Sequence, residues 1–333
     1  MRIPNLPILL DIQFYFCSSR YIACLKFKFR SKTKSMIILD GGIGRHLEKI
    51  GAPFGQPEWS ALSLIQDPDF VFRAHHDFIN AGADVITTNS YAIVPFHIGR
   101  SRFEQEGKVL LHKAGNIARK AAKSHKKEVK VAASIPPVFG SYKPDVFDSI
   151  KSLPILELFK NNLVQYCDLI LAETLSCIDE IETVQKVFGN CKIPFWMSLT
   201  IEDEYKNYPC LRSGEKLITA LGKIDFNKIS SVLFNCSQPE FMAKAVRVAK
   251  DVIPKNINIG VYANAFQPIK TGQKDANSQI RGTRKELTPG KYLDFVKEWT
   301  ELEIDIVGGC CGIGPDHIKR ICDFKKDIID HNT

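Results

Sequence analysis

Several features that would place the chain in a special class of protein are missing from its 333 residues. No apolar run approaches the roughly 20 residues of a membrane-spanning helix, so no membrane role is expected. With 44% hydrophobic and 25% charged residues, the composition is that of a globular protein. This composition excludes disordered, collagen-like and coiled-coil chains.

Little net positive charge remains once the first 35 residues are set aside. The net charge is +8, but residues 1–35 hold seven Lys or Arg against Asp11 alone. The chain from Met36 onward therefore carries a net charge of only +2. Because most of the excess positive charge lies at one end, no surface for binding a phosphate backbone is evident, and no nucleic-acid partner is expected.

Residues 1–35 are predicted to be an N-terminal extension, followed by one domain over residues 36–333. The Arg-rich, acid-poor extension resembles an organelle transit peptide, but it lacks a clean amphipathic helix. A non-folded segment or a wrongly assigned start is therefore favoured over a targeting segment. Met36 opens the first predicted strand.

Ten cysteines are too few for a disulfide scaffold in a chain of this length, and no signal-peptide cleavage pattern precedes them. A reducing, cytoplasmic setting is therefore expected. In that setting the adjacent pair Cys310-Cys311 is better explained as metal ligands or redox groups than as a disulfide, since neighbouring residues would close a strained ring.

Short apolar runs alternate with helical segments from Met36 onward. Continuous apolar runs of this kind are typical of strands buried on both faces of a parallel sheet. Eight strand-helix units predict a (β/α)8 TIM barrel, an α/β fold. A doubly wound sheet is the alternative, but the segment DGGIG at residues 40–44 lacks the GxGxxG spacing that binds a pyrophosphate. The predicted strands are residues 36–39, 84–88, 129–135, 169–172, 195–199, 231–234, 257–262 and 304–307.

The predicted helices carry start and stop signals. Ser237 and Glu240 have the spacing of a capping box, and Gly82 and Gly189 stand where a left-handed residue ends a helix. Proline in the first turn predicts further helix starts at Asp67-Pro68, Thr288-Pro289 and Gly314-Pro315.

The active site of such a barrel lies at the C-terminal ends of its strands. The residues that follow the predicted strands are Asp40, Asn89, Pro136, Glu173, Thr200, Asn235-Cys236, Ala263-Asn264 and Cys310-Cys311. Three cysteines thus share one rim. Three thiolates with an open fourth position can bind a catalytic zinc ion, and Gly308-Gly309 would let the backbone turn so that the sulfurs converge.

Less specific interpretations stay open for each candidate. Cys236 alone is compatible with a core cysteine, and Cys310-Cys311 with a packing pair or a redox dithiol. Asp40 is also suited to a turn before two glycines, and Glu173 to a partner of a helix N-terminus.

Other polar residues of the sequence are weaker candidates. His75-His76 are interpreted as surface or packing residues, and Asn89 and Asn235 as groups that order loops or substrate. The remaining cysteines, Cys322 among them, are interpreted as small buried hydrophobes or surface thiols. The loop over residues 264–288, with its polar segment 270–285, either covers the site or is simply solvated.

Four motifs carry a resemblance to a known family: ILDGG at residues 38–42, HHDFINAGADVITTNSY at 75–91, FNCSQPE at 234–240 and GGCCGIGPDHI at 308–318. From about residue 36 to about residue 321, the chain resembles the homocysteine S-methyltransferases. The resemblance implies a zinc-dependent barrel that methylates homocysteine to give methionine. It also implies that Cys236, Cys310 and Cys311 bind zinc, and that Asp40, Gly41 and Glu173 bind homocysteine.

Two departures bear on the methyl donor. Betaine-dependent members carry Glu-Tyr where this chain has Glu173-Thr174, and they have a C-terminal oligomerisation extension that this chain lacks. The resemblance therefore favours a sulfonium donor, S-methylmethionine or S-adenosylmethionine. The alternatives are betaine as donor, another thiol or selenol as acceptor, or a non-enzymatic redox dithiol protein. Only small-molecule substrates are expected as partners, for a monomer or a small homo-oligomer.

Overall fold

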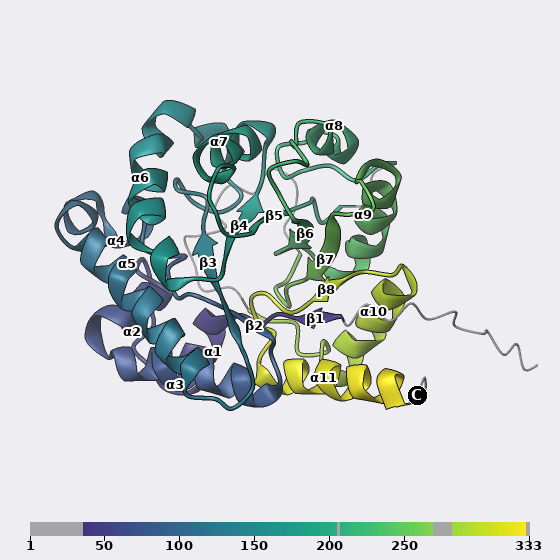
Figure 1. Ribbon diagram of the computed structural model, residues 1–333, viewed down its shortest axis with the longest axis horizontal. Coiled ribbons are helices and arrows are strands. Elements are labelled where there is room, and N and C mark those ends of the chain that lie inside the picture. The colour runs from purple at the N-terminus through teal and green to yellow at the C-terminus, as the bar shows by residue number, and fades with distance from the viewer. Residues whose placement is uncertain (1–35, 205–206, 269–281, 331–333) are drawn as a thin grey trace, which may run out of the picture. The chain divides into compact units, whose positions relative to one another are not determined.

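Eight short parallel strands form the inner layer of the computed structural model, which describes residues 36–204, 207–268 and 282–330 (Figure 1). The predicted N-terminal extension, 1–35, lies outside the described residues. The strands are β1 (Ile37–Ile38), β2 (Val85–Thr87), β3 (Lys130–Ile135), β4 (Leu169–Leu175), β5 (Phe195–Leu199), β6 (Ser231–Asn235), β7 (Asn258–Tyr262) and β8 (Ile306–Val307).

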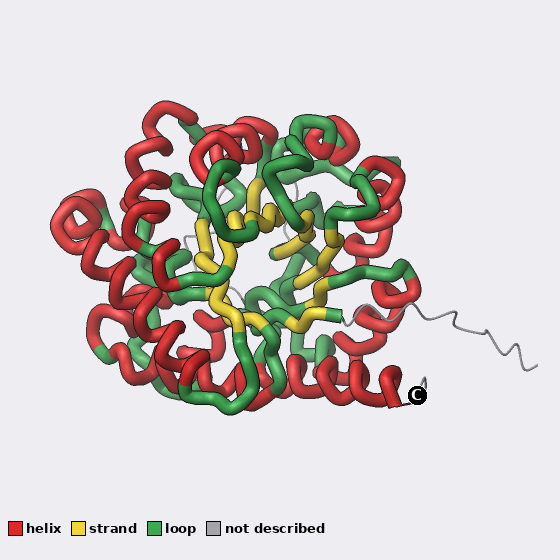
Figure 2. Tube along the Cα trace, viewed as in Figure 1, coloured by secondary structure: helices red, strands yellow, loops and turns green. Residues whose placement is uncertain are grey.

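The strands pair in the order β1-β8-β7-β6-β5-β4-β3-β2, and every neighbouring pair is parallel. An isolated bridge between Leu39 and Val85 joins β1 to β2 and completes the ring, which Figure 2 shows end on. The prediction of a (β/α)8 barrel is confirmed. A doubly wound sheet is excluded, since it would leave two edge strands unpaired.

Helices surround this ring (Figures 1 and 2). They are α1 (Ile43–Lys49), α2 (Ser60–Gln66), α3 (Pro68–Ala81), α4 (Pro95–Ile98), α5 (Arg100–Lys123), α6 (Ser149–Asn162), α7 (Ile178–Phe188), α8 (Leu217–Leu221), α9 (Pro239–Val252), α10 (Pro289–Glu301) and α11 (Pro315–Asp330), with 3-10 turns η1 (Pro144–Val146) and η2 (Val164–Tyr166). Within the described residues, no helix combines the length and apolar character needed to cross a membrane.

Most of the predicted helix signals are confirmed and two are wrong. Gly82 ends α3 in the left-handed region, with φ of 108°. Gly189 ends α7 with φ of −63°, so the left-handed conformation predicted there is wrong. The predicted capping box is also wrong: Ser237 Oγ accepts from the Ile201 N–H and donates to the Ile201 carbonyl, and Glu240 pairs with Arg284. Tertiary contacts have replaced the local ones.

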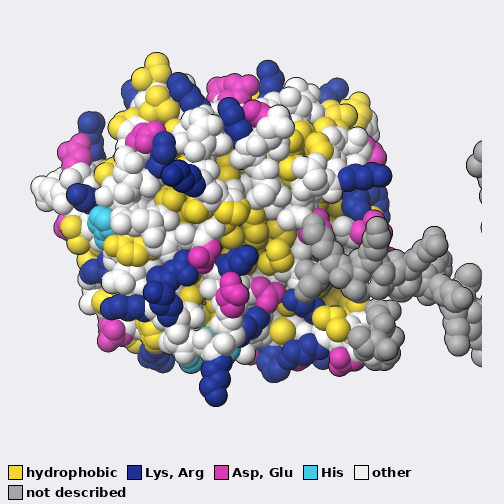
Figure 3. Space-filling view, in the orientation of Figure 1, with side chains coloured by type: hydrophobic (Ala, Val, Ile, Leu, Met, Phe, Trp, Pro, Cys, Tyr) yellow, Lys and Arg dark blue, Asp and Glu magenta, His cyan; other side chains and the backbone are white. Residues whose placement is uncertain are grey.

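Apolar side chains fill the barrel on both sides of the sheet. Those pointing inward include Leu171, Trp196, Leu233 and Tyr262, whereas the larger core lies between the strands and the helices. On the face drawn in Figure 3, Lys, Arg, Asp and Glu side chains are interspersed around an apolar centre. The barrel is therefore a packed scaffold, and its chemistry is carried by residues at the strand ends.

Three aspartates fix the register at the opposite, N-terminal end of the barrel. Asp84, Asp168 and Asp305 each lie directly before a strand, β2, β4 and β8 respectively. Each accepts a hydrogen bond of 2.7–2.9 Å from a backbone N–H of the adjacent strand; the donors are Ile38, Val131 and Ile259. These contacts tie neighbouring strands together where the ladder begins.

Candidate metal centre and acceptor site

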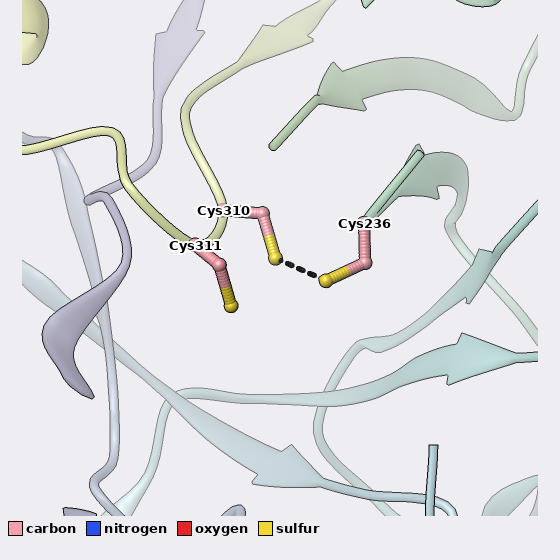
Figure 4. A group of neighbouring side chains, drawn as sticks. All are labelled: Cys236, Cys310 and Cys311. Atoms are coloured by element: carbon pink, nitrogen blue, oxygen red, sulfur yellow. Dashed lines mark hydrogen bonds between the residues drawn. The ribbon is translucent and has the colours of Figure 1, made fainter. Parts of the chain in front are cut away.

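The three predicted cysteines meet at the C-terminal mouth of the barrel (Figure 4). Cys236 follows β6, and Cys310-Cys311 follow β8. Their three Sγ atoms all lie within 4.8 Å of one another, and the Sγ atoms of Cys236 and Cys310 are 2.7 Å apart. In the part of the chain that the structure describes, this is the one cluster of three His, Cys, Asp or Glu side chains spaced to hold a metal ion.

The donor set suits a soft, tetrahedral metal ion. Three sulfur ligands bound at about 2.3 Å from one zinc ion lie roughly 3.8 Å from each other, a separation within the spread that these thiols already show. Hydrogen bonds from Cys310 and Cys311 lower the pKa of Cys236, and hydrogen bonding to Cys236 in turn raises the pKa of Cys310. The two neighbouring thiols thus favour the charged form of Cys236.

The glycines before the cysteine pair serve close packing. A Cβ on Gly308 would lie 2.5 Å from the Leu39 Cβ, and one on Gly309 would lie 2.1 Å from the Ile313 side chain. Neither glycine has a positive φ, so the expectation that they supply the turn is wrong. Gly312, with φ of 84°, is the left-handed residue of this loop.

Asp40 is buried at the end of β1, and its carboxylate accepts hydrogen bonds from β2. The Thr87 N–H donates at 2.7 Å and the Thr87 hydroxyl at 3.1 Å. Burial raises the pKa of Asp40 to about 8, and the negative charge of Glu173 contributes to the shift. The carboxylate therefore bonds to β2, the neighbouring strand of the ring.

Gly41 packs against the cysteine loop. A Cβ at this position would lie 2.1 Å from the Ile313 carbonyl oxygen. The next residue, Gly42, donates its N–H to the same carbonyl at 2.9 Å, and the Gly309 N–H donates to the Asp40 carbonyl at 3.0 Å. These contacts fix the Asp40 turn against the loop that carries Cys310 and Cys311.

Glu173 lies inside β4 with its carboxylate in the barrel mouth. It accepts from Ser134 Oγ at 2.5 Å and from the Tyr262 hydroxyl at 3.3 Å. Burial raises the pKa of Glu173 to about 7. The helix-terminal role considered for Glu173 belongs instead to Glu180, which accepts from the Ser176 N–H and hydroxyl at the start of α7.

The two rim asparagines order loops. Asn235 Oδ1 accepts from the Thr174 N–H at 2.9 Å and from Ser198 Oγ at 2.8 Å, which holds Thr174 in the left-handed region, with φ of 63°. Asn89 donates to the Ser60 carbonyl at 3.0 Å. Asn235 thus supports the residue directly after Glu173.

The remaining candidates lie away from the cysteines. His75 is fully buried in α3, where burial lowers its pKa to about 4, and its ring nitrogens have no hydrogen-bond partner; His76 bonds to Asn80. Cys322 packs on Gly82 at the barrel exterior. In the 264–288 loop, residues 269–281 lie outside the described residues, and Arg284 ties one described end to the other through the Ala265 carbonyl.

Sequence reasoning missed several polar residues beside the cysteines. Tyr142 and Arg212 both donate to the Cys236 carbonyl, and Asp203 pairs with Arg212. Tyr262 is the last residue of β7, and its hydroxyl donates to Glu173 at 3.3 Å. Tyr262 could have been found by its position as the last residue of β7, but the loop residues Tyr142 and Arg212 carry no spacing signal.

The fold and the cysteine cluster together define a barrel protein with a site that could hold a metal ion. The chain matches the sequence model described as homocysteine S-methyltransferase over residues 37–324. Homocysteine S-methyltransferase 1 of Brassica oleracea var. italica is 30% identical over 321 residues, covering 87% of this chain and 93% of that protein. The chain belongs to the homocysteine S-methyltransferase family and is a methyltransferase.

The chain is also similar in sequence to a second methyltransferase and in fold to a solved structure. Selenocysteine Se-methyltransferase, also of Brassica oleracea var. italica, is 26% identical over 319 residues, covering 87% of this chain and 89% of that protein. The crystal structure of the homocysteine methyltransferase MmuM from Escherichia coli, in its metallated form, is similar with a TM-score of 0.71 and 23% identity, covering 88% of this chain and 97% of that one. The structural likeness agrees with the barrel fold.

Proposed function

We propose that the enzyme moves a methyl group from a sulfonium donor to the thiolate of L-homocysteine, giving methionine, at a zinc ion held by Cys236, Cys310 and Cys311. The observation that carries this proposal is the position of three converging thiols beside two buried carboxyl groups, Asp40 and Glu173, at one barrel mouth. Thiols near pKa 8.5 are mostly protonated at neutral pH, and zinc, when bound, keeps the acceptor sulfur ionised.

The protein residues bind and orient the acceptor. Asp40 and Glu173 would accept hydrogen bonds from the homocysteine ammonium group and so hold its sulfur over the cysteine cluster. A bound ammonium group favours the charged form of both carboxyls, which offsets the effect of burial on their pKa values. Ser134 and Tyr262 fix the Glu173 carboxylate by donating to it.

The reaction balances without an oxidant or a further co-reactant. The homocysteine thiol releases its proton to solvent on binding, and its sulfur lone pair forms the new bond to the methyl carbon. The bond between that carbon and the donor sulfur breaks, and its electron pair leaves with the donor, which becomes a neutral thioether. S-methylmethionine and S-adenosylmethionine both fit this requirement.

A donor and acceptor screen with metal analysis tests the proposal. We expect about one zinc ion per chain, and methionine formed from homocysteine with S-methylmethionine or S-adenosylmethionine but not with betaine. Cys236→Ala, Cys310→Ala and Cys311→Ala should each abolish turnover and lower zinc content, because three protein ligands are the minimum for this site. Cys322→Ala, which alters packing against Gly82, is the matched control and should keep both.

The same screen distinguishes the alternatives. Activity with betaine, or methylation of selenocysteine in preference to homocysteine, would replace the proposed donor or acceptor. A metal-free chain in which a disulfide between Cys310 and Cys311 forms and is reduced reversibly would support a redox dithiol protein and overturn the proposal.

We also propose a reducing compartment, the cytoplasm, and a monomer or small homo-oligomer. The eight cysteines of the described residues are all free thiols, and a metal site made of three cysteines requires reduced sulfur. Light scattering coupled to size exclusion, together with imaging of the tagged full chain, tests both statements. Recovery of the enzyme from an oxidising compartment would contradict the first.

A further inference from the structure

Cys236 has a backbone conformation that few residues other than glycine adopt. Its φ is 52°, in the left-handed region, where a side chain is sterically disfavoured. A residue persists in this region when its surroundings hold it there. The next strand contributes only one long hydrogen bond, from the Cys236 N–H to the Tyr262 carbonyl at 3.4 Å.

The surroundings act on the Cys236 carbonyl oxygen. The Tyr142 hydroxyl donates to it at 2.7 Å, Arg212 Nη2 at 3.3 Å and Thr200 Oγ1 at 3.4 Å. The carbonyl carbon and the Cβ of Cys236 are both bonded to its Cα, so their relative directions are fixed by covalent geometry. Donors that hold this oxygen therefore restrict the direction of the Cα–Cβ bond that carries the Cys236 sulfur.

Arg212 is itself held firmly. Its guanidinium makes two 2.9 Å hydrogen bonds to the Asp203 carboxylate, and the side chains of the two residues are only 7% and 1% exposed. One face of the guanidinium stacks on the Tyr142 ring, 4.6 Å from its centroid. Asp203 also accepts from the Gln238 N–H at 3.0 Å, so the group holds the chain two residues beyond Cys236 as well.

We infer that Arg212 and Tyr142 are positioning residues for Cys236. Through the carbonyl oxygen they keep Cys236 in the left-handed conformation that brings its sulfur to Cys310 and Cys311. Released from these donors, the residue would relax toward an extended conformation and its sulfur would leave the cluster. The inference rests on the proposed function, because the sulfur is taken to be a metal ligand.

Tyr142→Phe gives the cleanest test, since it removes one donor and keeps the stacked ring. The measurement is the rate at which the zinc-loaded full chain releases zinc to a chromogenic chelator at 25 °C. We expect release faster by on the order of fivefold, as for the loss of one hydrogen bond. The absorption bands of the cobalt-substituted protein should shift, because the ligand geometry changes.

Two further variants separate positioning from folding. Arg212→Lys keeps a positive charge opposite Asp203. An ammonium group lacks the planar set of N–H donors with which the guanidinium bonds both the carboxylate and the Cys236 carbonyl. Zinc release should therefore again be faster than in wild type. Tyr208→Phe removes an exposed hydroxyl from the loop that also carries Arg212, and it should release zinc at the wild-type rate.

Melting of the metal-free proteins completes the test. Faster release and a shifted cobalt spectrum, with a melting temperature near that of wild type, would support positioning. Wild-type release rates and spectra in both Tyr142→Phe and Arg212→Lys would overturn it, as would a lowered melting temperature with an unchanged spectrum. A wild-type chain that binds no zinc would instead contradict the proposed function.

Discussion

The carboxyl group of Glu173 is buried in a setting that disfavours its charge. Burial raises its pKa to about 7, and that of Asp40 to about 8, although both carboxyls accept hydrogen bonds. Two neighbouring carboxyl groups whose charge is disfavoured by burial would both be stabilised by a cation bound between them. This arrangement supports their assignment to the acceptor ammonium group.

Substitution of Glu173 tests that assignment. Glu173→Gln keeps an acceptor for Ser134 and Tyr262 but removes the charge. We expect the homocysteine KM to rise and kcat/KM to fall by about 10- to 150-fold, as for a lost charge-assisted hydrogen bond worth roughly 1.5–3 kcal/mol. Zinc content should stay at the wild-type level, and kinetics with homocysteine provide the measurement.

A short thiol without an amino group, 2-mercaptoethanol, is the control for this variant. Wild type and Glu173→Gln should differ far less with it than with homocysteine. Because a buried charge is removed, the melting temperature should not fall. Equal losses with both thiols and a lower melting temperature would make Glu173 a scaffold residue.

Among individual residues, the sequence predicted the site residues that directly follow strands. It missed the residues whose side chains bond to a backbone carbonyl of the site. Cys236, Cys310 and Cys311 could be placed together because parallel strands bring their C-terminal ends to one rim. Tyr142 and Arg212 lie 94 and 24 residues from Cys236 and reach its carbonyl from loops. No periodicity or motif encodes such a contact.

The strands and helices were predicted more completely than their ends. All eight predicted strands occur, since each is a continuous apolar run between polar loops. The ends of elements depend on tertiary contacts: Ser237 bonds to Ile201 of a neighbouring loop, and Gly189 stays in a right-handed conformation. A local signal is therefore a weaker guide to an element's boundary than to its existence.

Asp84 connects several elements at the base of the barrel. It accepts from the Ile38 N–H of β1 and pairs with Lys127 and with Lys325 of α11. Burial works against its charge, but these hydrogen bonds outweigh burial and lower the pKa of Asp84 below its ordinary value of 3.8. Its contribution to stability is therefore complete above pH 3.8 and is lost as the pH falls through the folded-state pKa.

Asp84→Asn should consequently be less stable than wild type at neutral pH. We expect the melting temperature at pH 7 to fall by a few degrees, as for about 1 kcal/mol in a domain of this size. The deficit in unfolding free energy, measured by urea titration, should stay constant from pH 7 to about pH 4 and shrink below it. Asp323→Asn, an exposed partner of Lys319 in α11, is the control and should change little. A deficit that persists unchanged at pH 3 would contradict this account.

The described barrel is complete without the first 35 residues. Its ring begins with β1 at Ile37 and closes through the bridge between Leu39 and Val85. The cysteine cluster and both carboxyl groups lie within residues 40–311. The division into an extension, 1–35, and a barrel domain, 36–333, follows from this closure as a prediction.

Deletion of residues 1–35 should therefore leave zinc binding, kcat and KM of the purified protein within about twofold of the full chain, because all eight strands of the ring and the proposed site lie beyond residue 35. The deletion also lowers the net charge from +8 to +2, so weaker retention on a cation-exchange column is expected.

A longer deletion, of residues 1–39, is the matched control. It removes β1 and the Leu39 bridge, opens the ring and exposes the inward-facing apolar side chains of β8 and β2, so the product should aggregate. Circular dichroism melts and zinc content of the two deletions provide the measurement. If deletion of residues 1–35 unfolds the protein as the longer deletion does, the extension is part of the barrel domain and the predicted boundary at residue 36 is wrong.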